Sequence, residues 1–172
     1  MLAAKEISLI GIFVALLVGG QWVLSGVSGI EIVTVLLLSF AFYFGIKRGL
    51  IVATAFSLLR CFIFGFFPNV IILYLIYYNL FVVVFGLLGK KFNRSIEVKR
   101  HIVIIAVAVA MTVFFTLLDN LISTFYFSFT WEVAKRYYLL SLTALVPQLV
   151  CTLITVLLLL PILIKLYAKT FK

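Results

Sequence analysis

The chain has 172 residues, of which 66% are hydrophobic and 11% are charged, too apolar a composition for the surface of a water-soluble domain. Its mean hydropathy of +1.36 also excludes disordered and low-complexity polar chains. Fourteen Lys and Arg against five Asp and Glu give a formal charge of +9, which in so apolar a chain indicates membrane topology rather than nucleic-acid binding. The composition therefore predicts an all-α membrane protein whose surroundings are the lipid bilayer.

Six apolar segments approach the length of about 20 residues that a helix needs to cross roughly 30 Å of hydrocarbon. In chain order they cover residues 7–25, 30–46, 49–67, 70–89, 101–128 and 137–164. The expected breaks are the turn at 25–29, the Lys47-Arg48-Gly49 corner, Pro68-Asn69, the charged segment 90–100 and a loop over 131–136. Because so few residues remain outside these segments, we expect residues 1–172 to form a single transmembrane domain of six spanning helices.

The basic residues predict the orientation of these helices. With a cytoplasmic N-terminus, the inner loops and ends contain Lys5, Lys47, Arg48, Lys90, Lys91, Arg94, Lys99, Arg100, Lys165, Lys169 and Lys172. Lys135 and Arg136 alone fall on the outer side, and Arg60 lies inside the third segment. The positive-inside rule therefore predicts that both termini are cytoplasmic. The first segment lacks a convincing A-x-A cleavage site, so we expect a retained helix rather than a signal peptide.

Three charged residues lie within or at the edge of the apolar segments. A charge near the centre of a helix costs about 2.5–3.5 kcal/mol to insert, so it normally faces protein or water. Arg60 and Asp119 are each expected roughly 12–14 Å below the outer helix ends, and Glu31 opens the second segment at the same surface. Two interpretations stay open: Arg60 and Asp119 neutralise each other as a structural pair, or a cavity that opens outward hydrates them.

Polar and aromatic residues also gather toward the outer side. The fifth segment carries Thr112, Thr116, Asp119, Ser123 and Tyr126 on one helical face, and the sixth carries Tyr138, Ser141, Gln148, Thr152 and Thr155. The outer aromatic residues are Trp22, Tyr74, Tyr77, Tyr78, Tyr126, Trp131, Tyr137 and Tyr138. Hydroxyl groups can simply join neighbouring helices, and aromatic residues can form an interfacial belt. Because the inner side offers only Tyr43 and Tyr167, the asymmetry favours a pocket for a flat polar molecule.

Other motifs limit the function further. Gly11, Ala15 and Gly19 recur every four residues and predict a smooth face that another helix can approach. Cys61 and Cys151 lie in apolar runs and are interpreted as packing residues, with no metal site. The sequence contains no HExxH, GxSxG, P-loop or GxGxxG motif. We therefore expect no enzyme and no cofactor.

Six segments in a chain of this size, the small-residue face over residues 11–19 and the polar aromatic outer side resemble the substrate-binding S component of an energy-coupling factor (ECF) vitamin transporter. The stretch from Gly11 to Gly19 is similar to the Ala-xxx-Ala motif of that family, although glycine stands on either side of Ala15. The resemblance implies a bacterial plasma membrane protein that captures a vitamin outside the cell. It also implies as partners a transmembrane coupling subunit, contacted by Gly11, Ala15 and Gly19, and two ATPase subunits.

The resemblance further implies a substrate site made by the loop after the first helix and the outer parts of helices four to six. The matching positions are Trp22, Asn69, Tyr74, Tyr78, Asp119, Asn120, Ser123, Trp131, Tyr138 and Gln148, with Glu31 and Arg60 as neighbours. A carboxylate ligand would use a free cation and cationic thiamin would use an acidic group beside an aromatic face. The Tyr, Asn and Gln side chains favour a largely uncharged ring system.

Two other classes of function stay open at the level of the sequence. A structural membrane scaffold of a cell-shape complex would close the outer polar cluster with internal hydrogen bonds and leave no cavity. A permease that acts alone would transport without a coupling ATPase.

Overall fold

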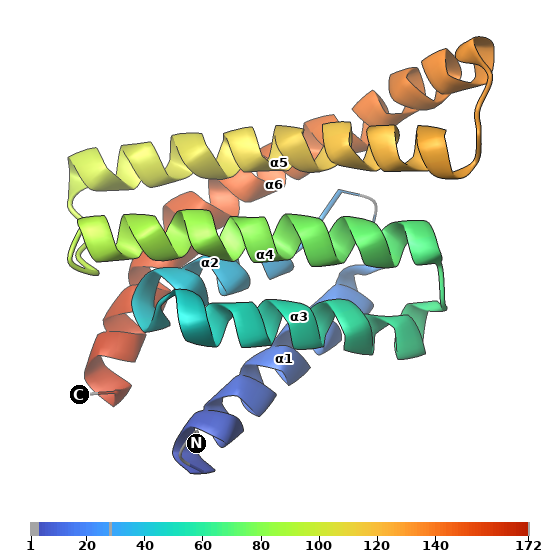
Figure 1. Ribbon diagram of the computed structural model, residues 1–172. Coiled ribbons are helices and arrows are strands. Elements are labelled where there is room, and N and C mark those ends of the chain that lie inside the picture. Colours follow the sequence, from blue (N-terminus) through green and yellow to red (C-terminus); the bar gives the residue numbers. More distant parts are fainter. Residues whose placement is uncertain (1–3, 28, 172) are drawn as a thin grey trace.

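A computed structural model describes residues 4–27 and 29–171 of the chain. Within these two ranges the protein is helical and has no strand. Its six helices are α1 (Ala4–Leu24), α2 (Val33–Phe44), α3 (Ile46–Phe64), α4 (Pro68–Lys91), α5 (Val98–Tyr126) and α6 (Trp131–Thr170). Helices α3, α4 and α5 run side by side, whereas α1 and α6 cross the bundle obliquely (Figure 1).

Long apolar helices make the chain a multi-pass membrane protein by class. Among the described residues, four helices have the length and composition to cross a membrane, namely α1, α4, α5 and α6. Large apolar side chains cover the outside of the bundle, as shown by Phe62, Phe66 and Phe125, which are 81%, 73% and 76% exposed. An apolar exterior of this extent is typical of a surface that lies in lipid.

Helix α2 lies at the centre of the bundle. Ten of its 12 residues are buried, and it packs against α1, α3, α4 and α6. At 1.5 Å per residue it is about 18 Å long, which is shorter than the hydrocarbon thickness of about 30 Å. The expectation of a spanning helix over residues 30–46 is thus not met. A helix that is apolar all round can be buried either in protein or in lipid. Glu31 lies in the connection before α2.

The corner between α2 and α3 lies earlier than the sequence pattern predicts. Gly45 adopts a φ of 87°, a region that favours glycine, and its N–H donates to the carbonyl of Ala41 at 3.0 Å. Helix α3 then begins at Ile46, so the prediction of a corner at Lys47-Arg48-Gly49 is wrong. Gly49 instead lies inside α3, where an added Cβ would meet Val82 of α4 at 2.6 Å.

The prediction of a loop over residues 131–136 is also wrong, because α6 begins at Trp131. The N–H of Ala134 donates to the carbonyl of Thr130 at 2.9 Å, and Glu132 in the first turn complements the helix dipole. The prediction treats the charged residues at positions 131–136 as the sign of a loop. They can equally extend a spanning helix into water, and α6 has 40 residues, about 60 Å.

The bundle has two chemically different ends. We call one the basic end: it contains the start of α1, the α2–α3 corner, the α4–α5 connection and the end of α6, and the two marked termini lie there (Figure 1). We call the other the hollow end: it contains the α1–α2, α3–α4 and α5–α6 connections. Placing both termini at one end agrees with a shared side of the membrane, while the identity of that side stays a prediction.

Candidate functional site

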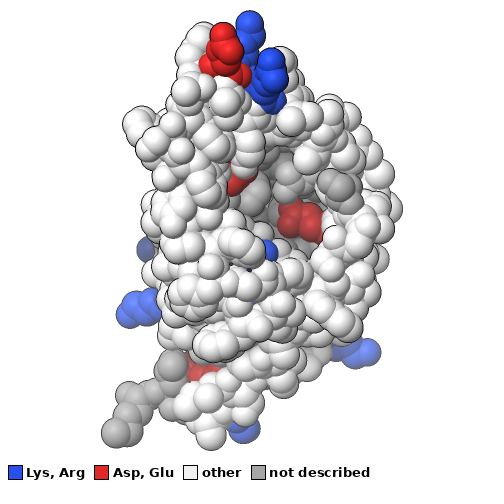
Figure 2. All heavy atoms as spheres, turned by 90° about the vertical axis from the view of Figure 1, so that its right-hand side faces the viewer, with Lys and Arg blue, Asp and Glu red and all other residues white. Residues whose placement is uncertain are grey.

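The hollow end has a depression at its centre. Figure 2 shows this face, with acidic atoms inside the depression and further charged side chains on its upper rim. A cavity of about 340 Å³ lies between α5 and α6 at this end. Its walls are formed by Phe115, Thr116, Asp119, Tyr137, Leu140, Ser141, Ala144 and Gln148. We use the name polar hollow for this cavity together with the adjoining residues Glu31, Arg60 and Tyr74.

Glu31 adjoins the cavity from the connection between α1 and α2. Its carboxylate accepts hydrogen bonds from Thr34 Oγ1 at 2.5 Å and from Gln148 Nε2 at 3.4 Å. Its backbone exchanges hydrogen bonds with the Cys151 thiol on α6. Burial raises the pKa of Glu31 above its ordinary value, and the hydrogen bonds from Thr34 and Gln148 lower it. Both donors to this carboxylate are neutral.

Arg60 on α3 is held by an amide and two aromatic rings. Its Nε donates to Gln21 Oε1 at 3.2 Å, and Gln21 Nε2 donates in turn to the Tyr74 hydroxyl at 3.0 Å. The guanidinium carbon lies 4.3 Å from the ring centroid of Tyr74 and 4.9 Å from that of Phe64. Such cation–π contacts stabilise the charge without neutralising it.

Asp119 on α5 is likewise bound by hydroxyl groups. Tyr137 donates to Asp119 Oδ2 at 3.2 Å, and Ser123 donates to Asp119 Oδ1 at 3.5 Å. Over residues 4–27 and 29–171, the ion pairs are Arg48–Glu6 and Arg100–Glu97. The structural pair between Arg60 and Asp119, one of the two interpretations of the sequence, is therefore not formed.

The tyrosines of α4 join the polar hollow to the core. Tyr74 packs against Tyr78 and Phe115, with ring centroids 4.9 Å and 6.0 Å away. Phe115 also forms a wall of the cavity, so Tyr74 connects the Arg60 cluster to it. Tyr77 and Tyr78 are only 2% and 3% exposed. These two rings support the wall from behind, and Tyr74 is the tyrosine that meets a charged group.

The polar hollow collects five of the residues that the resemblance indicates, namely Glu31, Arg60, Tyr74, Asp119 and Gln148, and a sixth, Ser123, donates to Asp119. Other residues lie elsewhere. Trp22 is 62% exposed, and Asn69 is buried in the first turn of α4. Asn120, Trp131 and Tyr138 line a different cavity of about 600 Å³ between α5 and α6. A hydrogen bond of 2.9 Å from Asn120 Nδ2 to Ser141 Oγ crosses between the two helices.

Three residues that hydrogen-bond the charged side chains of the polar hollow are not part of the expected site. Gln21 joins Arg60 to Tyr74, Thr34 binds Glu31, and Tyr137 takes the place expected for its neighbour Tyr138. Thr34 follows Glu31 by three residues, a spacing that brings side chains together when a helix starts there. Gln21 was detectable as a polar side chain in the last turn of an apolar helix. The choice between Tyr137 and Tyr138 as the residue at the site depends on where the helix begins, because the start at Trp131 sets the direction of both side chains.

The small residues of α1 lie on the outer surface. Gly11, Ala15 and Gly19 are exposed, and a Cβ added at either glycine would meet nothing within 4 Å among the described residues. Gly11 and Ala15 line a groove of about 520 Å³ between α1 and α3, whose α3 wall includes Ala55 and Leu59. We call it the small-residue groove. In the described part of the chain these residues are not used for internal packing.

The fold and the site define an all-helical, multi-pass membrane protein with a polar hollow at one end of its bundle. Comparisons of the chain with protein-family models, with curated proteins and with solved structures find no match.

Proposed function

We propose that the chain is the substrate-capture subunit of a membrane transporter and binds a small water-soluble molecule in the polar hollow. The observation that supports this proposal is the bonding of Glu31, Arg60 and Asp119. Among the described residues, each has only neutral hydrogen-bond partners. Charged groups within a membrane protein are costly unless water, a ligand or an opposite charge compensates them. A hollow that admits a polar solute supplies that compensation.

The chemistry of the walls favours a flat ring system with several hydrogen-bonding groups. Gln148 offers an amide, Tyr137 offers a hydroxyl, and Phe115, against which Tyr74 packs, offers an aromatic surface. The cavity of about 340 Å³ falls within the size range of small-molecule sites. A flavin, a queuosine precursor or the base of a corrinoid has this combination of flat surface and polar edge.

The resemblance to ECF S components extends the proposal to partners and location. In that arrangement the hollow end faces outward from a bacterial plasma membrane. A transmembrane coupling subunit would dock on the small-residue groove, and two ATPase subunits would drive release of the vitamin inside the cell. The exposure of Gly11, Ala15 and Gly19 supports a contact of this kind, because small residues allow helix backbones to approach closely.

Ligand binding tests the central part of the proposal. The protein is purified in mild detergent, the small molecules that remain bound are identified by mass spectrometry, and a vitamin panel is screened by thermal shift. We expect Asp119→Asn and Glu31→Gln to weaken binding of the identified ligand by about tenfold or more, since each carboxylate adjoins the hollow. The matched control is Glu132→Gln, which changes an exposed acid at the start of α6. An absence of any ligand and any shift would contradict the proposal.

Uptake measurements test the partner separately. Ala15→Leu places a larger side chain in the small-residue groove, so we expect uptake by cells that express the coupling subunit and ATPases to fall strongly while binding is unchanged. Leu139→Ala, on the exposed side of α6, serves as the control. Equal loss of binding and uptake in Ala15→Leu would contradict a docking role.

A further inference from the structure

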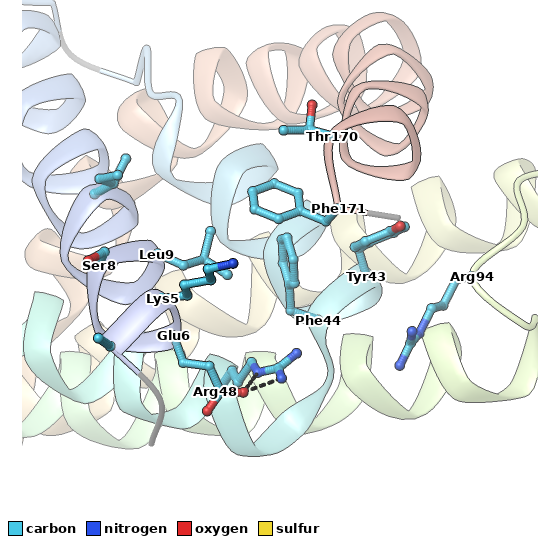
Figure 3. A pocket seen from close by; sticks show the side chains of 12 residues that line it. Lys5, Glu6, Ser8, Leu9, Tyr43, Phe44, Arg48, Arg94, Thr170 and Phe171 are labelled. Carbon is cyan, nitrogen blue, oxygen red and sulfur yellow. Dashed lines mark hydrogen bonds and ion pairs between the residues drawn. The ribbon is translucent and has the colours of Figure 1, made fainter. Parts of the chain in front are cut away.

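A further cavity, of about 710 Å³, lies at the basic end of the bundle. Figure 3 shows that residues from the start of α1, the end of α2, the start of α3, the α4–α5 connection and the end of α6 meet around it. We call it the basic-end cavity. It lies at the opposite end of the bundle from the polar hollow, so what it binds does not depend on the proposed function.

One part of the basic-end cavity is aromatic and aliphatic. The ring of Phe44 lies 5.0 Å from that of Tyr43 and 5.1 Å from that of Phe171, measured between centroids. Leu9 and Ile12 of α1 continue this wall. Ile12 is 59% exposed, and the exposed apolar face of α1 begins beside it. A hydrocarbon chain in the membrane can therefore enter the cavity along α1 without crossing a polar rim.

The other part of the cavity is cationic. Arg48 is paired with Glu6, to which its Nε donates at 3.0 Å. Lys5 and Arg94 lie on opposite sides of the Phe44 ring in Figure 3, and no ion pair involves either of them within the described residues. The turn that carries Arg94 is fixed by a hydrogen bond of 2.9 Å from its N–H to the carbonyl of Gly89. Its guanidinium carbon lies 5.9 Å from the ring centroid of Tyr43.

The remainder of this end strengthens the positive charge. Ten Lys and Arg of the described chain lie in its connections and helix ends, against two acids, Glu6 and Glu97. Both acids are already paired with arginines. An anion that approaches the basic-end cavity therefore meets unneutralised cations. Basic pockets between helices at the cytoplasmic surface of membranes commonly hold anionic lipid head groups.

We propose that the basic-end cavity binds one anionic phospholipid, whose head group faces the cations Lys5 and Arg94 at the sides of the cavity and whose acyl chain lies along Leu9 and Ile12. A free phosphate ion would use the cations but leave the aromatic wall without a partner. A neutral lipid would use the wall but leave Lys5 and Arg94 unneutralised. An anionic phospholipid is the one component of the bilayer that satisfies both parts.

Native mass spectrometry of the purified full chain tests this assignment. The protein is exchanged into micelles that contain phosphatidylglycerol and phosphatidylcholine in equal amounts, and the lipid that stays bound is counted. We expect phosphatidylglycerol to be retained in preference. The double variant Lys5→Gln/Arg94→Gln should bind it at least about tenfold more weakly, since each cation near a membrane surface contributes about a factor of five.

Lys135→Gln/Arg136→Gln is the matched control, because it removes the same charge from the hollow end. Thermal shift in the absence of lipid verifies that both double variants fold. If Lys5→Gln/Arg94→Gln is unstable, Arg94→Lys takes its place and should retain part of the preference for phosphatidylglycerol, because it keeps the charge. Equal retention of the two lipids, or an equal effect of the control variant, would overturn the proposal. Displacement of the lipid by millimolar inorganic phosphate would reassign the cavity to a soluble anion.

Discussion

The two ends of the bundle treat acidic groups in opposite ways. At the basic end, Glu6 and Glu97 form ion pairs with Arg48 and Arg100. At the hollow end, Glu31 and Asp119 accept hydrogen bonds from Thr34, Gln148, Tyr137 and Ser123, and Arg60 donates to an amide. The hollow end thus contains both signs of charge, and the described residues do not bring them together.

This difference separates two uses of charge in one membrane protein. Paired ions near the membrane surface are already neutralised and contribute mostly to topology and local order. Charged groups whose partners are neutral can still bind water or a polar solute. The comparison therefore indicates the hollow end as the place for a water-soluble ligand. Variants at both ends test whether the bonding of their charged groups differs in this way.

The largest effect is expected at the basic end, where α4 and α2 are in direct contact. A Cβ added at Gly89 of α4 would overlap the carbonyl oxygen of Phe42 on α2. We expect Gly89→Ala to destabilise the protein by about 2–3 kcal/mol, because a backbone atom cannot yield without shifting α2. Gly11→Ala is the matched control, since it meets open space and gains about 0.5–1 kcal/mol of helix propensity. Unfolding in detergent measures both variants, and equal effects would contradict a direct contact between α4 and α2 at Gly89.

The next effect concerns the bonding of Asp119. Tyr137→Phe removes the hydroxyl that donates to Asp119 and contacts Ser123. We expect a loss of about 1–2 kcal/mol in stability or in ligand binding, because the carboxylate loses a partly buried donor. Tyr138→Phe is the control, since this neighbour lines the other cavity. Titration of ligand and thermal unfolding measure the pair of variants. A larger effect of Tyr138→Phe would place the site in the other cavity.

A third variant creates an ion pair at the hollow end, like the ion pairs at the basic end. Gln21→Glu places a carboxylate where the amide accepts from Arg60 Nε. The new ion pair should raise stability by about 1 kcal/mol, since it is partly shielded from water and the Tyr74 hydroxyl can donate to it. Gln21→Leu is the companion variant and should lower stability by a similar amount. A fall in melting temperature with Gln21→Glu would show that Arg60 is already neutralised.

The smallest effect is a dependence of stability on pH. Burial raises the pKa of Glu31 above 4.5 in the folded protein, so the folded state binds this proton more tightly than the unfolded chain. The stabilisation is complete below about pH 4.5 and is lost as the pH rises through the folded-state pKa. Glu31→Gln should remove this slope from the melting temperature, whereas Glu132→Gln should keep it. An unchanged slope in Glu31→Gln would assign the dependence to another group.

The sequence predicts the helical class of the fold better than the ends of the helices. The long apolar runs locate α1, α4 and α5 to within a few residues, because lipid and core both require apolar side chains. The start of α6 at Trp131 and the corner at Gly45 were misplaced. Charge at positions 131–136 is compatible with helix or loop, and the choice between Gly45 and Gly49 depends on a contact with Val82 that only the assembled bundle contains.

The chemical character of the site was more predictable than its partners. Intramembrane charge and a matching depth indicated Arg60 and Asp119, since such charges are costly. Depth along a helix does not tell which direction a side chain takes around it. The amide of Gln21 therefore meets Arg60 instead of the expected acid. Trp22 and Trp131, selected for their aromatic character, are exposed, as expected of aromatic residues at a membrane interface.

The shortness of α2 leaves a non-helical connection beside the polar hollow. Its neighbours α3 and α4 continue past Val33, whereas the chain before it is not helical. The difference between 12 residues and the roughly 20 of a full span corresponds to about 12 Å of absent helix. Glu31 lies in the connection before α2 and accepts a hydrogen bond from Gln148 in the cavity wall, so a carboxylate stands where a longer α2 would place a helical turn. Two added helical turns before Val33 should separate Glu31 from Gln148 and so remove one acidic group from the side of the cavity.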